Sequence, residues 1–138
     1  MSLKNKKILL IIGGGISAYK SLDLIRLLQR KGSSVKVVLT KSGKKFVTSL
    51  SISSLSKNRV FEEMFDEKNK GKIDHISLSR WADLILIIPS TANFMSKLSR
   101  GGADDLASTI ILASNKEIFL VPAMNVRMWL HKATQKNL

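Results

Sequence analysis

Short, almost wholly apolar runs separated by helix-like segments constrain most strongly what this chain can fold into. A strand buried on both faces of a parallel sheet needs a continuous β-branched and leucine run rather than an alternating one. The runs that fit this pattern are Lys7–Ile12, Val35–Leu39, Asp83–Ile88 and Glu117–Val121. Because strands spaced by helices favour parallel pairing, we predict an α/β fold of Rossmann-like type. The predicted architecture is a three-layer sandwich, with a parallel sheet and helices on both faces.

The segments between these runs supply the helices of this prediction. Leucine and isoleucine recur at helical spacing after the first run, and Gly32 stands where a C-cap glycine is expected. The expected helices are Ser17–Lys31, Ser42–Leu55, Ala92–Ser99 and Asp104–Ala113. We expect Val60–Phe65 to form a short additional strand, followed by a polar loop over Asp66–Ile73.

Length and composition limit the class of protein. The 138 residues predict one domain over 1–138, and no apolar run reaches the roughly 20 residues that span a bilayer. With no cysteine, disulfides and thiolate metal sites are excluded, no metal site is expected, and a reducing cytoplasm is the expected location. The formal net charge of +13 comes from 17 Lys and 6 Arg scattered along the chain. Lysine on solvated faces therefore explains the charge better than nucleic-acid binding.

A glycine-rich turn joins the first predicted strand to the first predicted helix. Gly13-Gly14-Gly15-Ile16-Ser17-Ala18 fits the dinucleotide fingerprint with alanine in the last glycine position, and such a turn lets a phosphate approach the backbone. The second strand ends in Thr40-Lys41-Ser42, without the acidic residue that usually holds an NAD ribose. Lys41 would suit a 2′-phosphate, whereas the hydroxyls of Thr40 and Ser42 favour a mononucleotide. A glycine turn without any ligand is the alternative.

Hydroxyl and amide side chains directly follow the third apolar run, in Ser90-Thr91-Ala92-Asn93. Ser, Thr and Asn are favoured N-caps, so this segment either caps the next helix or binds a ligand with the same groups. The stretch Gly101-Gly102-Ala103-Asp104-Asp105 comes next along the chain. Its aspartates also suit a helix N-terminus, where acidic side chains complement the dipole.

Two further segments carry side chains with catalytic potential. Pro122-Ala123-Met124-Asn125 follows the last apolar run, at the carboxyl edge where open α/β sheets hold ligands. Asn125 either caps a helix or binds a carboxylate through its uncharged amide. The other segment is His75-Ile76-Ser77-Leu78-Ser79-Arg80-Trp81-Ala82-Asp83. Taken alone, a histidine is more often a surface or satisfied residue, and this is what we expect of His131.

In this order, the segments resemble the flavin-dependent cysteine decarboxylases, above all the phosphopantothenoylcysteine decarboxylases of coenzyme A biosynthesis. The resemblance runs from about Lys7 to Trp129. It implies an FMN cofactor bound by Gly14, Gly15, Ile16, Ser17, Thr40, Ser42, Ser90, Thr91, Ala92, Asn93, Ala103 and Asp104. It also implies that His75 and Asn125 are catalytic. Substrate contacts are implied for Arg80, Ala123, Met124 and Asn125.

The implied reaction is the FMN-dependent decarboxylation of 4′-phosphopantothenoylcysteine to 4′-phosphopantetheine, catalysed by a carboxy-lyase. Members of the resembled family are homotrimers or higher oligomers such as dodecamers, with the flavin at a subunit interface. We expect the same here, with Trp81, Phe94 and Trp129 as exposed apolar residues beside the ligand loops. Neither a nucleic acid nor a membrane is an expected partner.

The sequence also departs from the resembled enzymes. In the coenzyme A enzyme a cysteine on a C-terminal flap supplies a proton in the reductive half-reaction, and many bacterial relatives carry a fused phosphopantothenate–cysteine ligase domain. Neither is present in these 138 residues. We therefore expect a C-terminally truncated or split form whose reductive half-reaction is in doubt, with a separate ligase as a candidate partner.

Three other interpretations stay open at this point. A peptidyl-cysteine decarboxylase would share the flavin site and stop at the enethiol, which needs no flap cysteine. A non-catalytic FMN-binding regulatory subunit would bind the cofactor and release no carbon dioxide. An NADP-binding Rossmann domain would differ in the spectrum of its bound cofactor.

Overall fold

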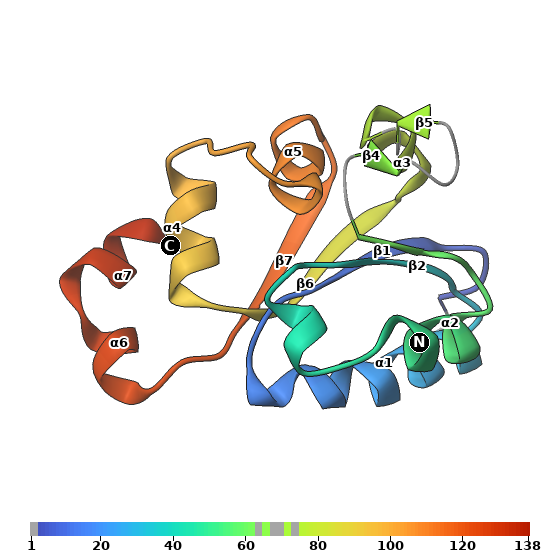
Figure 1. Cartoon of the computed structure of the whole chain (residues 1–138), viewed down its shortest axis with the longest axis horizontal. Coiled ribbons are helices and arrows are strands. Elements are labelled where there is room, and N and C mark those ends of the chain that lie inside the picture. The colour runs from blue at the N-terminus through green and yellow to red at the C-terminus, as the bar shows by residue number, and fades with distance from the viewer. Residues whose placement is uncertain (1–2, 63–64, 67–70, 73–74) are drawn as a thin grey trace.

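A parallel sheet forms the centre of the computed structural model, which describes residues 3–62, 65–66, 71–72 and 75–138. The sheet has five strands in the order β3-β2-β1-β6-β7 (Figure 1). The strands are β1 Lys7–Ile12, β2 Ser34–Leu39, β3 Val60–Phe61, β6 Leu84–Ser90 and β7 Glu117–Pro122. The chain proceeds outward from β1 to β3 and then returns to the other side of β1 as β6. The strand order thus reverses between β1 and β6, where ligands bind in open α/β sheets.

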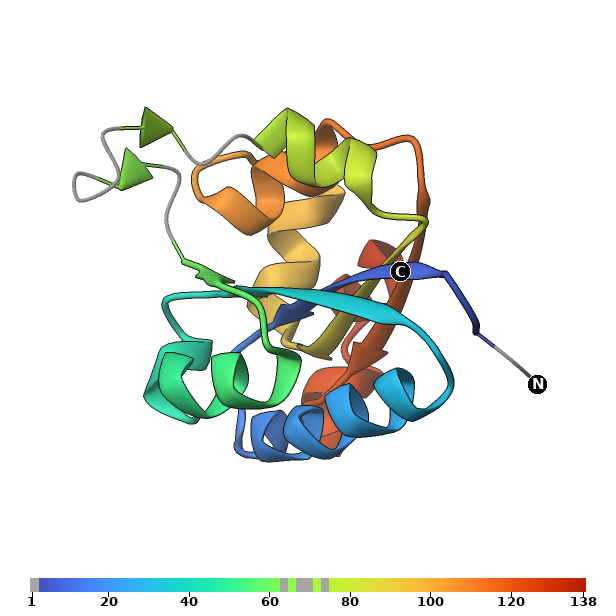
Figure 2. The same ribbon diagram turned by 90° about the vertical axis from the view of Figure 1, so that its right-hand side faces the viewer.

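Each face of the sheet carries its own apolar core, because successive side chains of a strand point to opposite faces. The covering helices are α1 Lys20–Arg30, α2 Ser49–Ser56, α3 His75–Trp81, α4 Ala92–Ser99 and α5 Leu106–Leu112. Ile8, Leu10 and Ile12 of β1 pack with α1 and α2, whereas Leu9 and Ile11 pack with α3, α4 and α5. Figure 2 shows these two helical layers on either side of the sheet. The predicted Rossmann-like sandwich is confirmed.

Two of the predicted helices are interrupted, for a local reason. The segment 17–31 begins with a 3₁₀ turn, η1 Ile16–Tyr19, before α1. The segment 42–55 divides into η2 Gly43–Lys45 and α2, because the Thr48 hydroxyl accepts a hydrogen bond from the Ser51 amide and starts a new helix. Hydroxyl side chains offer the backbone alternatives to a continuous helix, so this serine-rich stretch could not form one from end to end.

The region after β3 differs from the prediction as well. The expected strand over Val60–Phe65 ends at Phe61, and Phe65–Asp66 forms β4. β4 pairs antiparallel with β5, Gly71–Lys72, which lies inside the segment predicted as the polar loop Asp66–Ile73. The rest of that predicted loop lies outside the described residues.

The C-terminal part of the chain leaves apolar side chains exposed. β7 is the edge strand of the sheet, and its Phe119 side chain is 55% exposed. It leads to α6 Val126–Leu130, which begins after Asn125 as the capping interpretation of that residue predicts, and to α7 Lys132–Asn137, which the sequence did not predict. Val126 and Leu130 are 67% and 68% exposed. Across the described ranges, no helix is both long and apolar enough to cross a membrane.

The aromatic residues expected at the surface are largely covered. Phe94 is only 8% exposed because it lies on the inner side of α4 and belongs to the core. Trp81 is half-buried, with the Lys36 ammonium 4.6 Å from the centre of its ring, and Trp129 is half-buried too. The expectation of an exposed side chain is therefore wrong for Phe94, whereas Trp81 and Trp129 are partly exposed. Ile16 and Leu50, at 82% and 76% exposed, are apolar side chains at the surface instead.

Candidate functional site

Three strand ends and one helix start surround a hollow at the carboxyl edge of the sheet. The loops after β1, β2 and β6 and the start of α5 contribute to it, and its volume is about 310 Å³. We call it the edge cavity. It is lined by Gly13, Gly14, Thr40, Lys41, Ser42, Thr91, Asn93, Phe94, Lys97, Asp104 and Asp105. Half of the predicted cofactor-binding residues thus meet at one place, beside the point where the strand order reverses.

The glycine turn after β1 is packed so closely that it leaves no room for side chains. A Cβ atom on Gly14 would lie 2.6 Å from the Cβ of Ser42, and one on Gly13 would lie 2.3 Å from the Pro89 carbonyl oxygen. Gly15 has a φ of 150°, a conformation that other residues rarely adopt. The turn therefore presents bare backbone to the cavity, as close approach of a phosphate requires.

The end of β2 is fixed to the end of β1 by a buried hydroxyl. Thr40 Oγ1 donates to the Ile12 carbonyl oxygen at 3.1 Å and accepts from the Gly43 amide at 3.0 Å. This hydroxyl therefore shapes the cavity wall through its own backbone contacts. Ser42 is exposed and lies against Gly14, so its hydroxyl belongs to the solvent side of the same wall.

The segment after β6 combines capping with cavity lining. Thr91 is the N-cap of α4, and its hydroxyl accepts from the Phe94 amide at 3.1 Å. Asn93 is exposed and lines the cavity. Ser90 is fully buried, and its Oγ has no hydrogen-bond partner among the described residues. The capping interpretation therefore holds for Thr91, while ligand binding by Asn93 stays a prediction.

An ionic cluster forms another part of the cavity wall. Lys97 Nζ of α4 lies 2.8 Å from Asp104 Oδ1 and 3.1 Å from Asp105 Oδ2. The hydrogen bond to Asp104 is the main cause that raises the pKa of Lys97; burial opposes it, and Asp105 adds to the rise. Burial acts most strongly on Asp105 and would raise its pKa. Hydrogen bonds from Ser108 and Lys97 outweigh burial and leave the pKa of Asp105 lowered.

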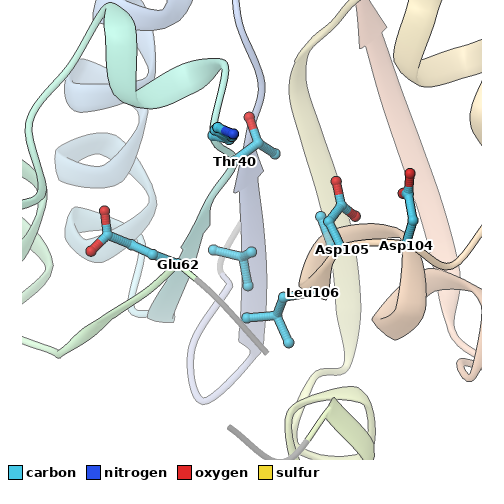
Figure 3. Close-up of a pocket in the computed structure, with 8 residues that line it drawn as sticks. Thr40, Glu62, Asp104, Asp105 and Leu106 are labelled. Carbon is cyan, nitrogen blue, oxygen red and sulfur yellow. The ribbon is translucent and has the colours of Figure 1, made fainter. Parts of the chain in front are cut away.

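A second hollow of about 250 Å³ adjoins the edge cavity and shares part of its wall (Figure 3). Thr40, Lys41, Asp104 and Asp105 border both spaces. Its other lining residues are Val38, Glu62, Leu106 and Ala107. In Figure 3 the labelled Glu62 lies on the strand side and Asp105 on the helix side. The two hollows thus extend the site from the strand ends toward β3.

The predicted catalytic histidine lies apart from the edge cavity. His75 begins α3 and Arg80 lies near its end, on a helix that packs against α5. His75 is half-buried and Arg80 is exposed, and the cavity's described lining includes neither. Within one chain, the structure does not bring either residue to the predicted cofactor site.

The predicted asparagine lies at another point, where it caps a helix. Asn125 Oδ1 accepts from the Met128 amide at 2.9 Å, so it is the N-cap of α6. The amide nitrogen of this exposed side chain donates to no acceptor among the described residues. Met124 borders a separate hollow of about 300 Å³ together with Pro122 and Trp129. Ala123 is held by a hydrogen bond of 3.0 Å from its amide to the Ser90 carbonyl oxygen, which ties this segment to the end of β6.

The remaining predicted cofactor residues flank the edge cavity without lining it: Gly15, Ile16, Ser17, Ser90, Ala92 and Ala103. Sequence reasoning missed Phe94 and Lys97 as lining residues and Glu62 in the adjoining hollow. For Lys97 a signal was present, because it lies four residues after Asn93 on the same helix and therefore on the same face. For Glu62 the sequence carried no comparable signal.

Comparison with known families extends what the geometry indicates. The model of the family described as Flavoprotein matches residues 1–138, the whole chain. The chain belongs to the flavoprotein family. The predicted resemblance is thereby confirmed at the level of the family.

Individual relatives agree with this membership. The coenzyme A biosynthesis bifunctional protein CoaBC of Haemophilus influenzae is 46% identical over 138 residues, which are 100% of this chain and 34% of that protein. CoaBC of Bacillus subtilis is 41% identical over 136 residues, 99% of this chain and 34% of that protein. The chain thus spans about a third of the length of these curated relatives.

Solved structures show the same similarity in three dimensions. The FMN-dependent cysteine decarboxylase SpaF superposes with a TM-score of 0.90 at 28% identity, covering 99% of this chain and 78% of that chain. A mutant PPC decarboxylase complexed with pantothenoylaminoethenethiol superposes with a TM-score of 0.82 at 32% identity, covering 97% and 75%. The fold and the family are therefore shared with decarboxylases that act on cysteine-derived groups.

Proposed function

We propose that this chain binds FMN in the edge cavity and acts as a phosphopantothenoylcysteine decarboxylase, a carboxy-lyase of coenzyme A biosynthesis. The observation that carries the proposal is the convergence of Gly14, Thr40, Ser42, Asn93 and Asp104 at the switch point of the sheet. Membership of the flavoprotein family and the 46% identity to a CoaBC protein support it.

The residues of the edge cavity fit a flavin mononucleotide. Bare backbone at Gly13 and Gly14 lines the same cavity as the start of α4, where the amides and the positive end of the helix dipole favour a phosphate. Asn93 and Ser42 add an amide and a hydroxyl at the rim. The buried Ser90 hydroxyl, without a partner among the described residues, is a further polar group at this strand end. We propose that these residues hold the cofactor, with Gly15, Ile16, Ser17, Thr91, Ala92 and Ala103 shaping the loops around it.

Bound FMN would supply a hydride acceptor for the carbon that bears the substrate thiol. His75 would serve as the catalytic histidine that promotes this oxidation, since imidazole exchanges a proton near neutral pH. Arg80 would bind the substrate phosphate or carboxylate, for which a guanidinium offers a two-pronged donor.

Asn125 would hold the carboxylate that is lost as carbon dioxide. Its Oδ1 is already engaged by the Met128 amide, so the side chain offers its amide nitrogen, a donor, to an anionic group. Because the amide is uncharged, it binds the carboxylate without fixing it in a salt bridge. Ala123 and Met124 would line the path of the substrate next to this group.

We further propose that a second copy of the chain completes the active site. His75 and Arg80 lie on α3, outside the described lining of the edge cavity, so a homotrimer, or a dodecamer built from trimers, would bring α3 of one copy to the cavity of another. The exposed Ile16 and Leu50 are apolar side chains that such an assembly would cover. Light scattering that shows only a 15.3 kDa species with flavin bound would contradict this assembly.

The reductive half-reaction needs a proton donor. In the resembled coenzyme A enzyme this donor is a cysteine. With no cysteine among the 138 residues, a cysteine donor would have to come from outside them. We propose that this segment carries out oxidation and decarboxylation in the cytoplasm. We also propose that it works with a phosphopantothenate–cysteine ligase.

Incubation with phosphopantothenoylcysteine tests the activity. We expect the flavin absorbance to bleach and carbon dioxide to be released, with little phosphopantetheine formed. A cysteine-ending peptide is the matched comparison, because it tests the alternative of a peptidyl-cysteine decarboxylase. If only the peptide released carbon dioxide, the substrate would be a cysteine-ending peptide and not phosphopantothenoylcysteine. If neither compound released carbon dioxide, the decarboxylase assignment would be wrong. Phosphopantetheine formation at a normal rate would show that the reductive half-reaction needs no cysteine donor.

A further inference from the structure

Lys97 occupies a particular place in the edge cavity. It lies four residues after Asn93 on α4, so the two side chains share a face of the helix and both line the cavity. The Lys97 side chain is only 19% exposed, and its ammonium lies within 3.1 Å of both Asp104 and Asp105. A lysine held this closely is not one of the solvated charges that cover the rest of the surface.

The two carboxylates that Lys97 contacts are held very differently. Asp105 caps α5, and its Oδ1 accepts from the Ser108 amide at 2.8 Å, so the helix itself fixes this carboxylate. The Asp104 side chain is 75% exposed, and its ion pair with Lys97 at 2.8 Å holds the carboxylate beside the cavity. Lys97 therefore links a rigid carboxylate to an exposed one.

The charges around the edge cavity balance only because Lys97 is present. Its charged lining residues are Lys41, Lys97, Asp104 and Asp105, two cations and two anions with a sum of zero. Without the lysine charge the sum becomes −1. A phosphate monoester carries about −1.5 to −2 charges near pH 7, so an unbalanced carboxylate in this wall would repel it.

We propose that Lys97 is a positioning residue that neutralises the Asp104–Asp105 pair and thereby allows the edge cavity to accept the phosphate of FMN. This inference rests on the proposed function. Lys97 acts through the two carboxylates, and its ammonium remains engaged with them. It follows that the effect of Lys97 depends on the charge of the ligand and on the presence of Asp104.

The wild type, three variants and two ligands test the inference. Lys97→Met keeps an unbranched side chain and removes the charge, Lys97→Arg keeps the charge, and Lys97→Met combined with Asp104→Asn restores a neutral wall. FMN and riboflavin, which lacks the phosphate, are titrated into each cofactor-free protein at low salt. Thermal unfolding of each variant reports whether the fold is intact.

We expect Lys97→Met to weaken FMN binding about tenfold at low salt, because one unit of charge acts on a phosphate a few ångströms away through a partly solvated site. The loss should shrink in high salt, where the screening length falls to about 3 Å. Riboflavin binding should not change. Lys97→Arg should bind FMN nearly as the wild type does, and the double variant should bind FMN more tightly than Lys97→Met does.

Other results would overturn the inference. An equal loss of FMN and riboflavin in Lys97→Met, or a double variant that stays as weak as Lys97→Met, would make Lys97 a structural residue. Unchanged FMN binding in Lys97→Met would show that the charge has no role. Failure of the wild-type protein to bind FMN would instead contradict the proposed function, and the inference with it.

Discussion

The edge cavity and the proposed catalytic residues are built in different ways. The described lining of the cavity comes from one chain: from loops at the ends of β1, β2 and β6, from α4 and from the start of α5. His75 on α3 and Asn125 at the start of α6 lie on elements outside its described lining. Under the proposed function this difference separates two tasks: one chain would supply the cofactor cavity, whereas chemistry would require further parts to approach the cofactor. Binding and turnover should therefore respond independently to substitution.

The largest expected effect concerns turnover. His75→Asn should slow bleaching of the flavin by phosphopantothenoylcysteine about 10²–10⁴-fold, because a proton-transfer group is lost. FMN affinity should stay near that of the wild type, since His75 is not in the described lining of the cavity. Stopped-flow absorbance measures the first quantity and FMN titration the second.

His131→Asn is the matched control for this substitution. His131 is exposed and caps α7 through Nδ1, and asparagine can cap a helix too. Its rate should equal that of the wild type. If His75→Asn lost FMN affinity as steeply as it lost rate, cofactor binding and catalysis would not be separable, and the comparison above would fail.

The next effect concerns binding. Gly14→Ala should weaken FMN binding about tenfold or more, because its Cβ would lie 2.6 Å from Ser42 Cβ and overpacking costs about 1–3 kcal/mol. Carbon dioxide release should fall with FMN occupancy and recover when FMN is added in excess. Calorimetric titration and a carbon dioxide assay at two FMN concentrations would measure this.

Gly101→Ala separates the effect of backbone conformation from that of the cavity. A Cβ there meets nothing within 4 Å, but its φ of 71° disfavours alanine, so a stability loss of about 1 kcal/mol is expected without a change in FMN affinity. Equal FMN affinities for Gly14→Ala and the wild type would place the cofactor away from the glycine turn.

The sequence predicted the parts of the fold that depend on local pattern. The apolar runs became β1, β2, β6 and β7 of the sheet, and the glycine turn and Asn93 came together because parallel strands end at one edge. It did not predict the break between η2 and α2, where the Thr48 hydroxyl competes for backbone amides. The contacts of Lys97 depend on how closely the end of α4 approaches the start of α5, which no local pattern encodes. The separation of His75 from the cavity likewise depends on where α3 packs.

The smallest expected effect concerns the cavity wall itself. Asp105→Ala removes the N-cap of α5 and should lower the free energy of unfolding by about 1 kcal/mol at neutral pH. Because folding lowers the pKa of Asp105, its contribution is present above its unfolded pKa and is lost as the pH falls through the lower folded pKa. The difference between wild type and variant should therefore shrink below about pH 4. Urea unfolding across a pH series measures it, and a difference that grows on acidification would contradict the direction of the shift.

FMN binding by the purified chain tests the central claim most directly. Absorbance spectra, mass analysis of the molecule released on denaturation, and titration of cofactor-free protein with FMN would establish whether the edge cavity holds this cofactor. We predict a yellow protein that releases FMN and takes up one FMN per chain at saturation. A colourless protein that fails to bind added FMN would contradict the account.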